Sequence, residues 1–164
     1  MTLTDGGLVL VAQCEGPANA ATLAQCQALA ERLGDELGLA GDDALALRLS
    51  VDEACTNIVE HGYAGTAGGP LSLQVWATPP GPGRLLRVQL RDRATPFDPR
   101  QARQPDLHAE VEDRAIGGLG WYFIHEMMDS VDYRRLPDGH NLLELTRACG
   151  GDASTPVPAP DPTP

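Results

Sequence analysis

Residues 50–63 read SVDEACTNIVEHGY and combine an apolar stripe with a polar one. Apolar side chains recur here, and in the turn before, at spacings of three and four residues: Leu47, Val51, Cys55 and Ile58. That spacing predicts a helix with one face on a core. Glu53, Asn57 and His61 are four residues apart and fall on the opposite face. Because any surface helix carries polar residues opposite its apolar stripe, this pattern alone leaves a structural and a functional interpretation open.

The residues before this segment predict a strand and a first helix. GLVLVAQ, residues 7–13, is short and rich in valine and leucine, as strands are. From Asn19 to about Leu39, apolar residues recur at helical spacing. Asp42 and Asp43 are predicted to supply the N-cap and the first-turn charge of the second helix, which ends near His61.

The residues after the second helix predict a hairpin, another helix and two more strands. PLSLQVWAT (70–78) and RLLRVQLRD (84–92) alternate apolar and polar residues, which is typical of strands with one face on a core. A third helix is expected to end near Asp129, followed by strands at about 130–136 and 141–147. This order predicts a two-layer α+β sandwich, in which three helices cover a mostly antiparallel mixed sheet.

The length and composition fit one globular domain. The chain has 164 residues, of which 42% are hydrophobic and 21% charged. We predict a single domain over residues 1–148 and a disordered, proline-rich tail over 149–164, where the apolar content is too low for a core. The stretch from Thr95 to Arg114 is charged, proline-bearing and weakly periodic, which predicts a long loop of the kind that often forms a lid.

The charge of the chain favours protein partners over nucleic acid. The formal net charge is −11, and the 12 basic residues are all arginine. Nucleic-acid affinity comes mostly from neutralised phosphates, so we expect no nucleic-acid binding. The sequence has no run of roughly 20 apolar residues that would span a membrane. With no signal-peptide pattern at its start, we expect a cytoplasmic protein without a membrane partner.

The cysteines are far apart in the sequence and form no CxxC pair: Cys14, Cys26, Cys55 and Cys149. This spacing indicates neither a zinc site nor a disulfide framework. We expect these residues to be small core side chains in a reducing compartment.

Two further segments could carry chemistry. RDRATPFDP, residues 91–99, places Asp92 where a strand ends, so its carboxylate could face a pocket; an aspartate beside a turn more often accepts hydrogen bonds from its own backbone. GGLGWYF, residues 117–123, places glycines just before a helix, where exposed N–H groups favour phosphates. The glycines could instead serve as a hinge or allow close packing, because the segment lacks a P-loop lysine and GxGxxG spacing.

Together these segments resemble the N, G1 and G2 boxes of the GHKL ATP-binding fold, and particularly the bacterial anti-sigma-factor serine kinases of the RsbW type. DEACTNIVEHGY is similar to their E-x-x-x-N helix with its His-Gly-Tyr turn, and DRATPFDP to their D-x-G-x-PFDP segment. GGLGWYFIHEMMDSVDYRR is similar to their GGLG-led helix and the M-D-x-V-x-Y strand that follows it. The resemblance follows the element order over roughly residues 7–147.

The resemblance implies roles for individual residues. Asn57 would bind Mg²⁺ through its amide oxygen, and Glu53 would act as the base or orienter for an attacking hydroxyl. Asp92 would accept a hydrogen bond from the adenine amino group of ATP. The other implied nucleotide contacts are Ala94, Phe97, Gly117, Gly118, Leu119 and Gly120.

The lid and two departures from the pattern complete this comparison. Residues 100–115 would form the ATP lid, and charge alone suggests that arginines in or near it face the γ-phosphate: Arg100, Arg103 and Arg114. Ala94 stands where the wider fold usually has glycine, and Trp121 stands where the resembling proteins tend to carry a smaller aliphatic residue.

The resemblance also implies a function. It implies an ATP- and Mg²⁺-dependent serine/threonine kinase and anti-sigma factor of a partner-switching module. Such a homodimeric protein holds a sigma factor or a STAS-domain antagonist and phosphorylates the antagonist, which a PP2C-type phosphatase then restores. Two alternatives stay open: a partner-switching kinase with a non-sigma output, such as secretion control, and a non-catalytic nucleotide-dependent binding module.

Overall fold

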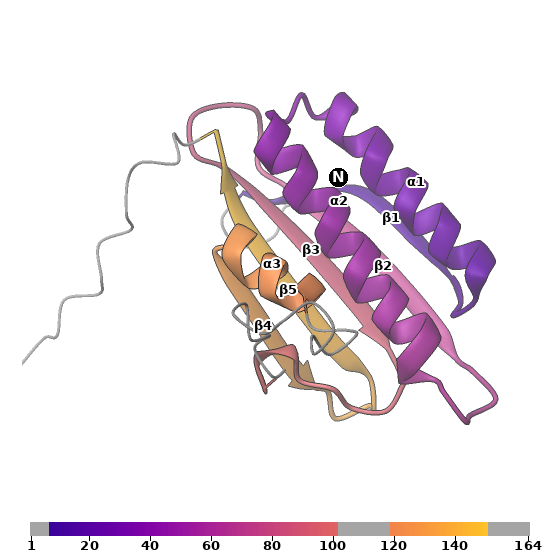
Figure 1. Cartoon of the computed structure of the whole chain (residues 1–164). Helices are drawn as coiled ribbons and strands as arrows, with labels where there is room; N and C mark the ends of the chain where they lie inside the picture. Colours follow the sequence, from indigo (N-terminus) through magenta and orange to yellow (C-terminus); the bar gives the residue numbers. More distant parts are fainter. Residues whose placement is uncertain (1–6, 102–118, 151–164) are drawn as a thin grey trace, which may run out of the picture.

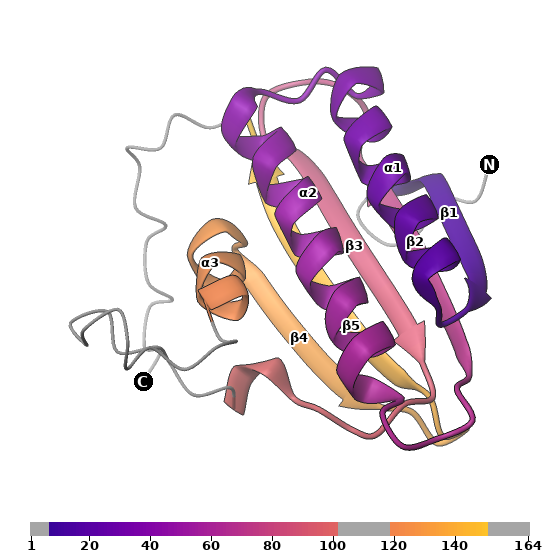
Figure 2. The ribbon, with the colours of Figure 1, turned by 45° about the vertical axis from the view of Figure 1, so that its right-hand side comes forward.

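The computed structural model describes residues 7–101 and 119–150. Its strands form one five-stranded sheet in the order β1-β2-β3-β5-β4. The elements, in chain order, are β1 (Val9–Pro17), α1 (Ala20–Glu36), α2 (Gly41–Thr56), β2 (Pro70–Ala77), β3 (Arg84–Asp92), α3 (Leu119–Met127), β4 (Ser130–Arg135) and β5 (Asn141–Cys149). The helices lie on one face of the sheet, with α1 over β1 and β2 and α3 beside α2 toward β4 (Figures 1 and 2). The predicted two-layer α+β architecture is confirmed.

The sheet contains the predicted antiparallel hairpin, formed by β2 and β3. Each neighbouring pair of described strands is antiparallel. In the β2–β3 hairpin, Leu73 faces Leu90 and Val75 faces Val88, and all four side chains are buried. The alternation read from the sequence therefore gives the correct face of each strand, because successive side chains of a strand point to opposite faces.

The core lies between the helices and the sheet. The apolar stripe of the second helix is buried as predicted, with Leu47, Val51 and Cys55 at 0% exposure and Ile58 at 7%. These side chains pack against the inward-facing residues of β2, β3 and β5. Burial of this stripe fixes which side of α2 remains for polar groups.

The ends of α2 differ from the prediction. Its N-cap is Ala40, which makes no side-chain capping bond, so the predicted N-cap is wrong, whereas the predicted acidic charge in the first turn is confirmed at Asp42 and Asp43. The Asp43 carboxylate instead accepts hydrogen bonds from Arg147 at 2.7 Å and from the Gly150 amide at 3.0 Å. At its other end α2 passes into a π-helical turn, Asn57–Gly62, rather than continuing as an α-helix.

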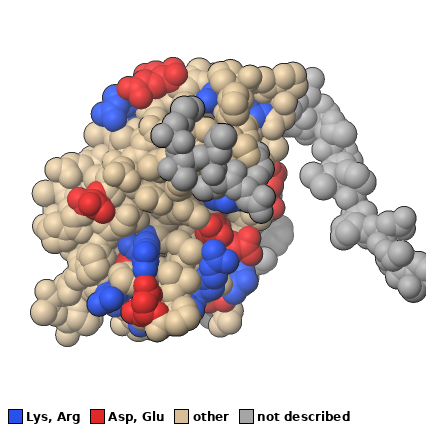
Figure 3. All heavy atoms as spheres, turned by 180° about the vertical axis from the view of Figure 1, so that it is seen from behind, with Lys and Arg blue, Asp and Glu red and all other residues tan. Residues whose placement is uncertain are grey.

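The sheet face away from the helices carries charges of both signs beside one another (Figure 3). Arg91 pairs with Asp138, and Arg134 lies 3.3 Å from Glu144. No helix among the described residues has the length and apolar character needed to cross a bilayer.

Candidate functional site

The predicted polar segments meet at the C-terminal end of α2. A pocket there is lined by residues from all three of them: Asn57, Gly62, Asp92, Ala94, Phe97 and Trp121. The strands β4 and β5 close its floor with Tyr133, Asn141 and Leu143. The fold thus assembles three segments that are separate in the sequence into one site.

Asp92 is the most firmly held residue of this pocket. Its side chain is 5% exposed, and its Oδ1 accepts hydrogen bonds from the Ala94 amide at 2.8 Å and from Asn141 Nδ2 at 2.7 Å. Both bonds reach the same oxygen, which leaves Oδ2 without a hydrogen bond from any described residue. Burial raises the pKa of Asp92, and the Asn141 and Ala94 bonds partly offset that rise. A fixed carboxylate with one free acceptor suits a ligand that offers an N–H donor.

Asn141 is itself fixed from the sheet. Its Oδ1 accepts hydrogen bonds from the Tyr133 hydroxyl at 2.7 Å and from Arg135 at 2.8 Å. Its Nδ2 donates to the Ala94 carbonyl at 3.1 Å as well as to Asp92. This network holds the Asp92 carboxylate in one orientation.

The sequence interpretation did not include Asn141, Tyr133 or Arg135 in the site. A signal was present: Asn141 occupies an inward position of an alternating strand whose next inward positions are Leu143 and Leu145. A buried amide at such a position requires polar partners. The pairing of Asn141 with Asp92 across β3 and β5 supplies them.

Ala94 lies against the π-helical turn. A methyl group at Gly62 would approach the Ala94 Cβ to 2.8 Å, so only glycine fits at Gly62 without a shift. The Thr95 amide donates to the Gly62 carbonyl at 3.1 Å, which ties the two segments together. The Ala94 methyl group, which stands where the wider fold usually has glycine, is therefore accommodated by Gly62 at the end of the π-helical turn.

Aromatic rings fill much of the pocket. The Phe97 and Trp121 centroids lie 6.0 Å apart, and the ring planes are tilted by 47°. Trp121 is 5% exposed and Phe97 is 42% exposed. The free volume between the lining residues is about 30 Å³. Small-molecule pockets usually hold roughly 300–1,000 Å³. The pocket between the described residues is therefore smaller than a small-molecule ligand needs.

Glu53 lies beside the start of α3. A methyl group at Gly120 would overlap the Glu53 carboxylate, so the glycine allows the carboxylate to lie directly against the helix backbone. Burial and the neighbouring Asp52 raise the pKa of Glu53, while His61 lowers it. A carboxylate with a raised pKa is a suitable proton acceptor.

Asn57 lies one helical turn after Glu53, where α2 passes into the π turn, and it lines the pocket. Its amide oxygen is a suitable Mg²⁺ ligand, because Mg²⁺ is usually held by one or two protein oxygens together with phosphates. His61 is exposed at the end of the turn. The described residues contain no group of three or more His, Cys, Asp or Glu side chains arranged for a metal ion. A metal at this site would therefore depend on Asn57 and the ligand's own oxygens.

The remaining predicted positions are only partly described. Leu119 is 39% exposed at the start of α3. Gly117, Gly118, Arg103 and Arg114 lie outside the described residues, as does most of the predicted lid. Arg100 is held by Asp98 at 2.8 Å and donates to the Tyr133 carbonyl at 3.2 Å.

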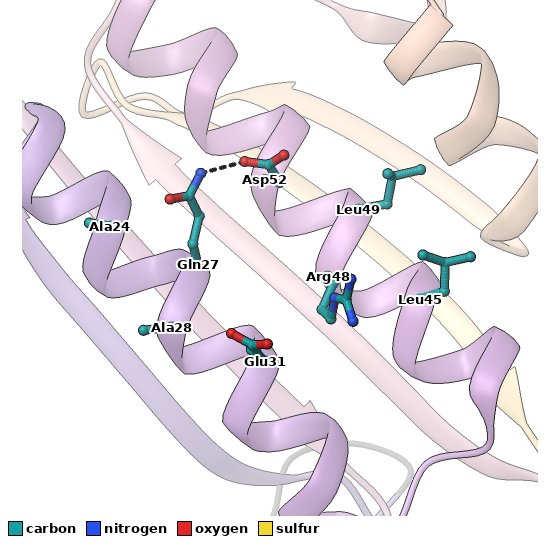
Figure 4. A pocket seen from close by; sticks show the side chains of 8 residues that line it. All are labelled: Ala24, Gln27, Ala28, Glu31, Leu45, Arg48, Leu49 and Asp52. Carbon is teal, nitrogen blue, oxygen red and sulfur yellow. Dashed lines mark hydrogen bonds between the residues drawn. The ribbon is translucent and has the colours of Figure 1, made fainter.

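A second hollow lies between α1 and α2 (Figure 4). Its volume is about 460 Å³, and it is lined by Ala24, Gln27, Ala28, Glu31, Leu45, Arg48, Leu49 and Asp52. Across it, Gln27 donates a hydrogen bond to Asp52. None of the predicted site residues lines this hollow, so the smaller pocket beside Asp92 is the candidate site.

The chain is similar to known proteins over most of its length. The profile of the family described as the histidine kinase-like ATPase domain matches residues 16–147. The serine-protein kinase RsbW of Halalkalibacterium halodurans is 29% identical over 121 residues, covering 70% of this chain and 68% of the relative. The serine-protein kinase RsbW of Bacillus cereus is 28% identical over 120 residues, covering 70% of this chain and 71% of the relative.

A solved structure shows the same fold. The RsbU and RsbW domains of a Mycobacterium tuberculosis protein match with a TM-score of 0.54 and 18% identity. The match covers 90% of this chain but 35% of that protein. At this identity the likeness is one of fold.

Proposed function

The chain belongs to the histidine kinase-like ATPase domain family, and on that premise we propose that it is an ATP-dependent protein serine/threonine kinase. The family name implies ATP as the nucleotide, and two relatives carry the name serine-protein kinase. The observation that carries the proposal is the free acceptor of Asp92 in a pocket that also contains Asn57, with the Glu53 carboxylate one helical turn from Asn57. This arrangement supplies a base-recognition group, a metal ligand and a proton acceptor.

The proposed site has two ends. At the adenine end, Asp92 accepts a hydrogen bond from the adenine amino group, and Ala94 and Phe97 line the base. We define this end by Asp92, Asn141 and Ala94. At the phosphate end, defined by Glu53, Asn57 and Gly120, Asn57 would hold Mg²⁺, which neutralises the phosphate charge. The backbone from Gly117 through Gly120 would enclose the phosphates.

Glu53 would act on the acceptor hydroxyl. The serine or threonine oxygen attacks the γ-phosphorus, the bond from that phosphorus to the bridging oxygen breaks, and ADP leaves. The hydroxyl proton passes to the Glu53 carboxylate. Because positioning and charge neutralisation supply most of the catalysis in phosphoryl transfer, this small set of groups suffices.

The partners are proposed from the resemblance of the sequence motifs to anti-sigma-factor serine kinases. We propose that the protein is the anti-sigma kinase of a partner-switching module, with a STAS-domain antagonist as substrate and a sigma factor as the second ligand; two relatives named serine-protein kinase support the kinase part of this proposal. A PP2C-type phosphatase would reverse the phosphorylation, and the kinase would act as a homodimer. The same site would serve a kinase with another output, because the difference lies in the partner.

A second candidate function is a non-catalytic, nucleotide-dependent binding module. The Glu53 carboxylate favours it, because within the described residues no hydrogen bond holds this proposed proton acceptor in place, whereas Asp92 at the adenine end is held by two. A domain of this kind would bind its partner in one nucleotide state and release it in another without transferring phosphate.

One experiment separates these functions. The full chain is incubated with Mg-ATP and with STAS-domain and sigma proteins encoded nearby, and phosphate incorporation and complex formation are both measured. The matched control is the STAS protein with its acceptor serine changed to alanine. The kinase proposal expects transfer to the STAS protein and none to the control. ATP-dependent complexes without transfer would overturn the kinase proposal in favour of the binding module.

A further inference from the structure

An arginine stands near the end of β5 at a position that faces the core. In the register of the sheet Arg147 lies opposite Leu86, whose side chain is 1% exposed, and two residues before it Leu145 is 0% exposed. The Arg147 side chain itself is 20% exposed. A guanidinium that is mostly buried is costly unless its N–H groups find acceptors. The partners of Arg147 therefore show what it does at this position.

The partners of Arg147 come from two different helices. Its Nε donates to Asp43 Oδ1 at 2.7 Å, in the first turn of α2. Its Nη1 donates to the carbonyl of Met127, the last residue of α3. The Asp43 side chain is 8% exposed, and its second oxygen accepts from the Gly150 amide at 3.0 Å. Because the planar guanidinium serves two acceptors in fixed directions, this one side chain joins the start of α2 to the end of α3.

The bond to Met127 stabilises the C-terminal end of α3. The last carbonyls of a helix lack partners within it, and a cation beside them is favourable. The residue that follows the helix end is held by the sheet: the Asp129 amide donates to the Thr146 carbonyl at 2.8 Å, and the Asp129 carboxylate accepts from the Ala148 amide at 2.6 Å. These two bonds reach β5 alone. Arg147 adds the link from this end of α3 to α2.

The other end of α3 lies at the candidate site. Gly120 is placed against the Glu53 carboxylate, near the end of α2. Met127 is joined through Arg147 to the start of α2, so the two helices lie side by side and run antiparallel (Figure 1). Gly120 and Met127 are seven residues apart, which is roughly 10 Å of helix. Because a helix this short moves as one piece, a shift at Met127 is passed on to Gly120.

We propose that Arg147 is a positioning residue, which sets the place of Gly120 beside Glu53 by holding the far end of α3 to α2. Its two partners, Asp43 and Met127, are not among the residues that line the pocket beside Asp92. Arg147 therefore acts on the phosphate end of the site and leaves the adenine end as it is. The effect on catalysis rests on the proposed kinase function, because it is exerted through Glu53.

The first test follows α3 without any activity. The chain has two tryptophans, so Trp76→Phe leaves Trp121 of α3, which is 5% exposed, as the fluorescent reporter. In this background Arg147→Met removes the charge and the donors but keeps a long side chain. We expect the Trp121 emission to shift to longer wavelength and its quenching by acrylamide to increase. The matched control is Arg32→Met, which breaks an exposed pair with Glu36 and should change neither quantity.

The second test measures phosphate transfer and ATP binding by the full chain. Arg147→Met should lower kcat about tenfold and leave the ATP affinity unchanged, because catalysis is sensitive to small misplacements of the reacting groups. In a Glu53→Gln background the same change should cause no further loss, since the group that it displaces is already absent. A further loss there, or a fall in ATP affinity, would make Arg147 a general structural residue and overturn the proposal.

A thermal melt checks that the variants are folded. If Arg147→Met is not, Arg147→Lys takes its place with the same expectations, since lysine keeps the charge beside Asp43 but lacks the planar fork that serves two acceptors. An unchanged Trp121 spectrum in a folded Arg147 variant also overturns the proposal. If the parent chain transfers no phosphate, the kinase function fails, and the Trp121 measurement alone decides whether Arg147 positions α3.

Discussion

The adenine end and the phosphate end of the candidate site are held by different kinds of contact. Asp92 receives two hydrogen bonds and is 5% exposed. Within the described residues, no hydrogen bond holds the Glu53 carboxylate, which is positioned by its steric contact with Gly120. The protein alone therefore fixes Asp92, the proposed base-recognition group. Glu53, the proposed proton acceptor, would gain its partners only with phosphates, metal and acceptor in place.

The largest effect should come from the loosely held end. Glu53→Gln removes the proton acceptor but keeps the size of the side chain, so we expect phosphate transfer to fall roughly 10²- to 10⁴-fold. ATP affinity should stay unchanged, because Glu53 touches no part of the base. Radiolabel transfer and calorimetric titration measure the two quantities.

The matched control for this variant is Glu60→Gln, an exposed glutamate on the adjoining π turn. Undiminished transfer by Glu53→Gln would remove Glu53 from the proposed mechanism. Equal losses in both variants would show that the charge of the helix, and not one carboxylate, matters.

Asp92→Asn should have the opposite profile. Losing the charged acceptor should weaken ATP binding roughly 10- to 100-fold. Because the folded-state pKa of Asp92 is raised, the folded chain binds the proton more tightly than the unfolded chain does. The free energy of unfolding therefore falls as pH rises from the ordinary aspartate value through the raised one. An amide oxygen still accepts from Ala94 and Asn141, so at neutral pH the melting temperature should hold or rise.

The measurements are a binding titration and a thermal melt of the same sample. A large fall in melting temperature with intact ATP affinity would mean that Asp92 is a structural residue only. Unchanged affinity and unchanged stability would also contradict its role at the adenine end.

Gly120→Ala tests the contact between the helix and Glu53. The added methyl must displace the end of the flexible Glu53 side chain, which costs little stability, and alanine favours a helix by up to about 1 kcal/mol. We expect transfer to fall about tenfold, because catalysis is sensitive to small misplacements. In a Glu53→Gln background the same change should have no further effect, since the carboxylate is already absent. Additive losses in the double variant would refute the contact as the cause.

Trp121→Leu should have the smallest effect and the opposite sign. Aromatic pairs are worth about 0.5–1.5 kcal/mol beyond the area they bury. If the base enters between Phe97 and Trp121, binding must first break their ring contact. Trp121→Leu removes that cost, so ATP binding should tighten by roughly 2- to 10-fold, provided that the melt shows a folded protein. Trp76→Leu is the control, because the burial alternation of β2 puts Trp76 on the sheet face opposite the core. Weaker ATP binding by Trp121→Leu alone would mean that the indole contacts the base.

Local periodicity in the sequence was enough to predict the helices and strands and to place Glu53 and Asn57 near each other. Spacings along a helix or strand repeat within a few residues, so the buried stripe through Leu47 and Val51 was correctly predicted, as was the inward face of the β2–β3 hairpin. The placement of Glu53 and Asn57 one turn apart follows from the same geometry. The position of Asp92 at the end of a strand was also predicted from the sequence alone.

The failed capping prediction shows where local reasoning stops. An aspartate at the start of a helix normally caps it. Asp43 instead pairs with Arg147, a residue 104 positions later, and this ion pair is stronger than a local bond to a helix amide. The residues near Asp43 in the sequence give no indication that Arg147 is its partner.

The sequence by itself determined the order of the elements, their buried faces and the identity of the polar groups, because these depend on neighbours a few residues apart. Only the tertiary structure decided that Asn141 fixes Asp92 from 49 residues away and that the Glu53 carboxylate lies against Gly120. The physical reason is that strand register and helix packing are set by the burial of whole faces. A contact between two faces depends on both of them at once, so neither stretch of sequence contains it alone.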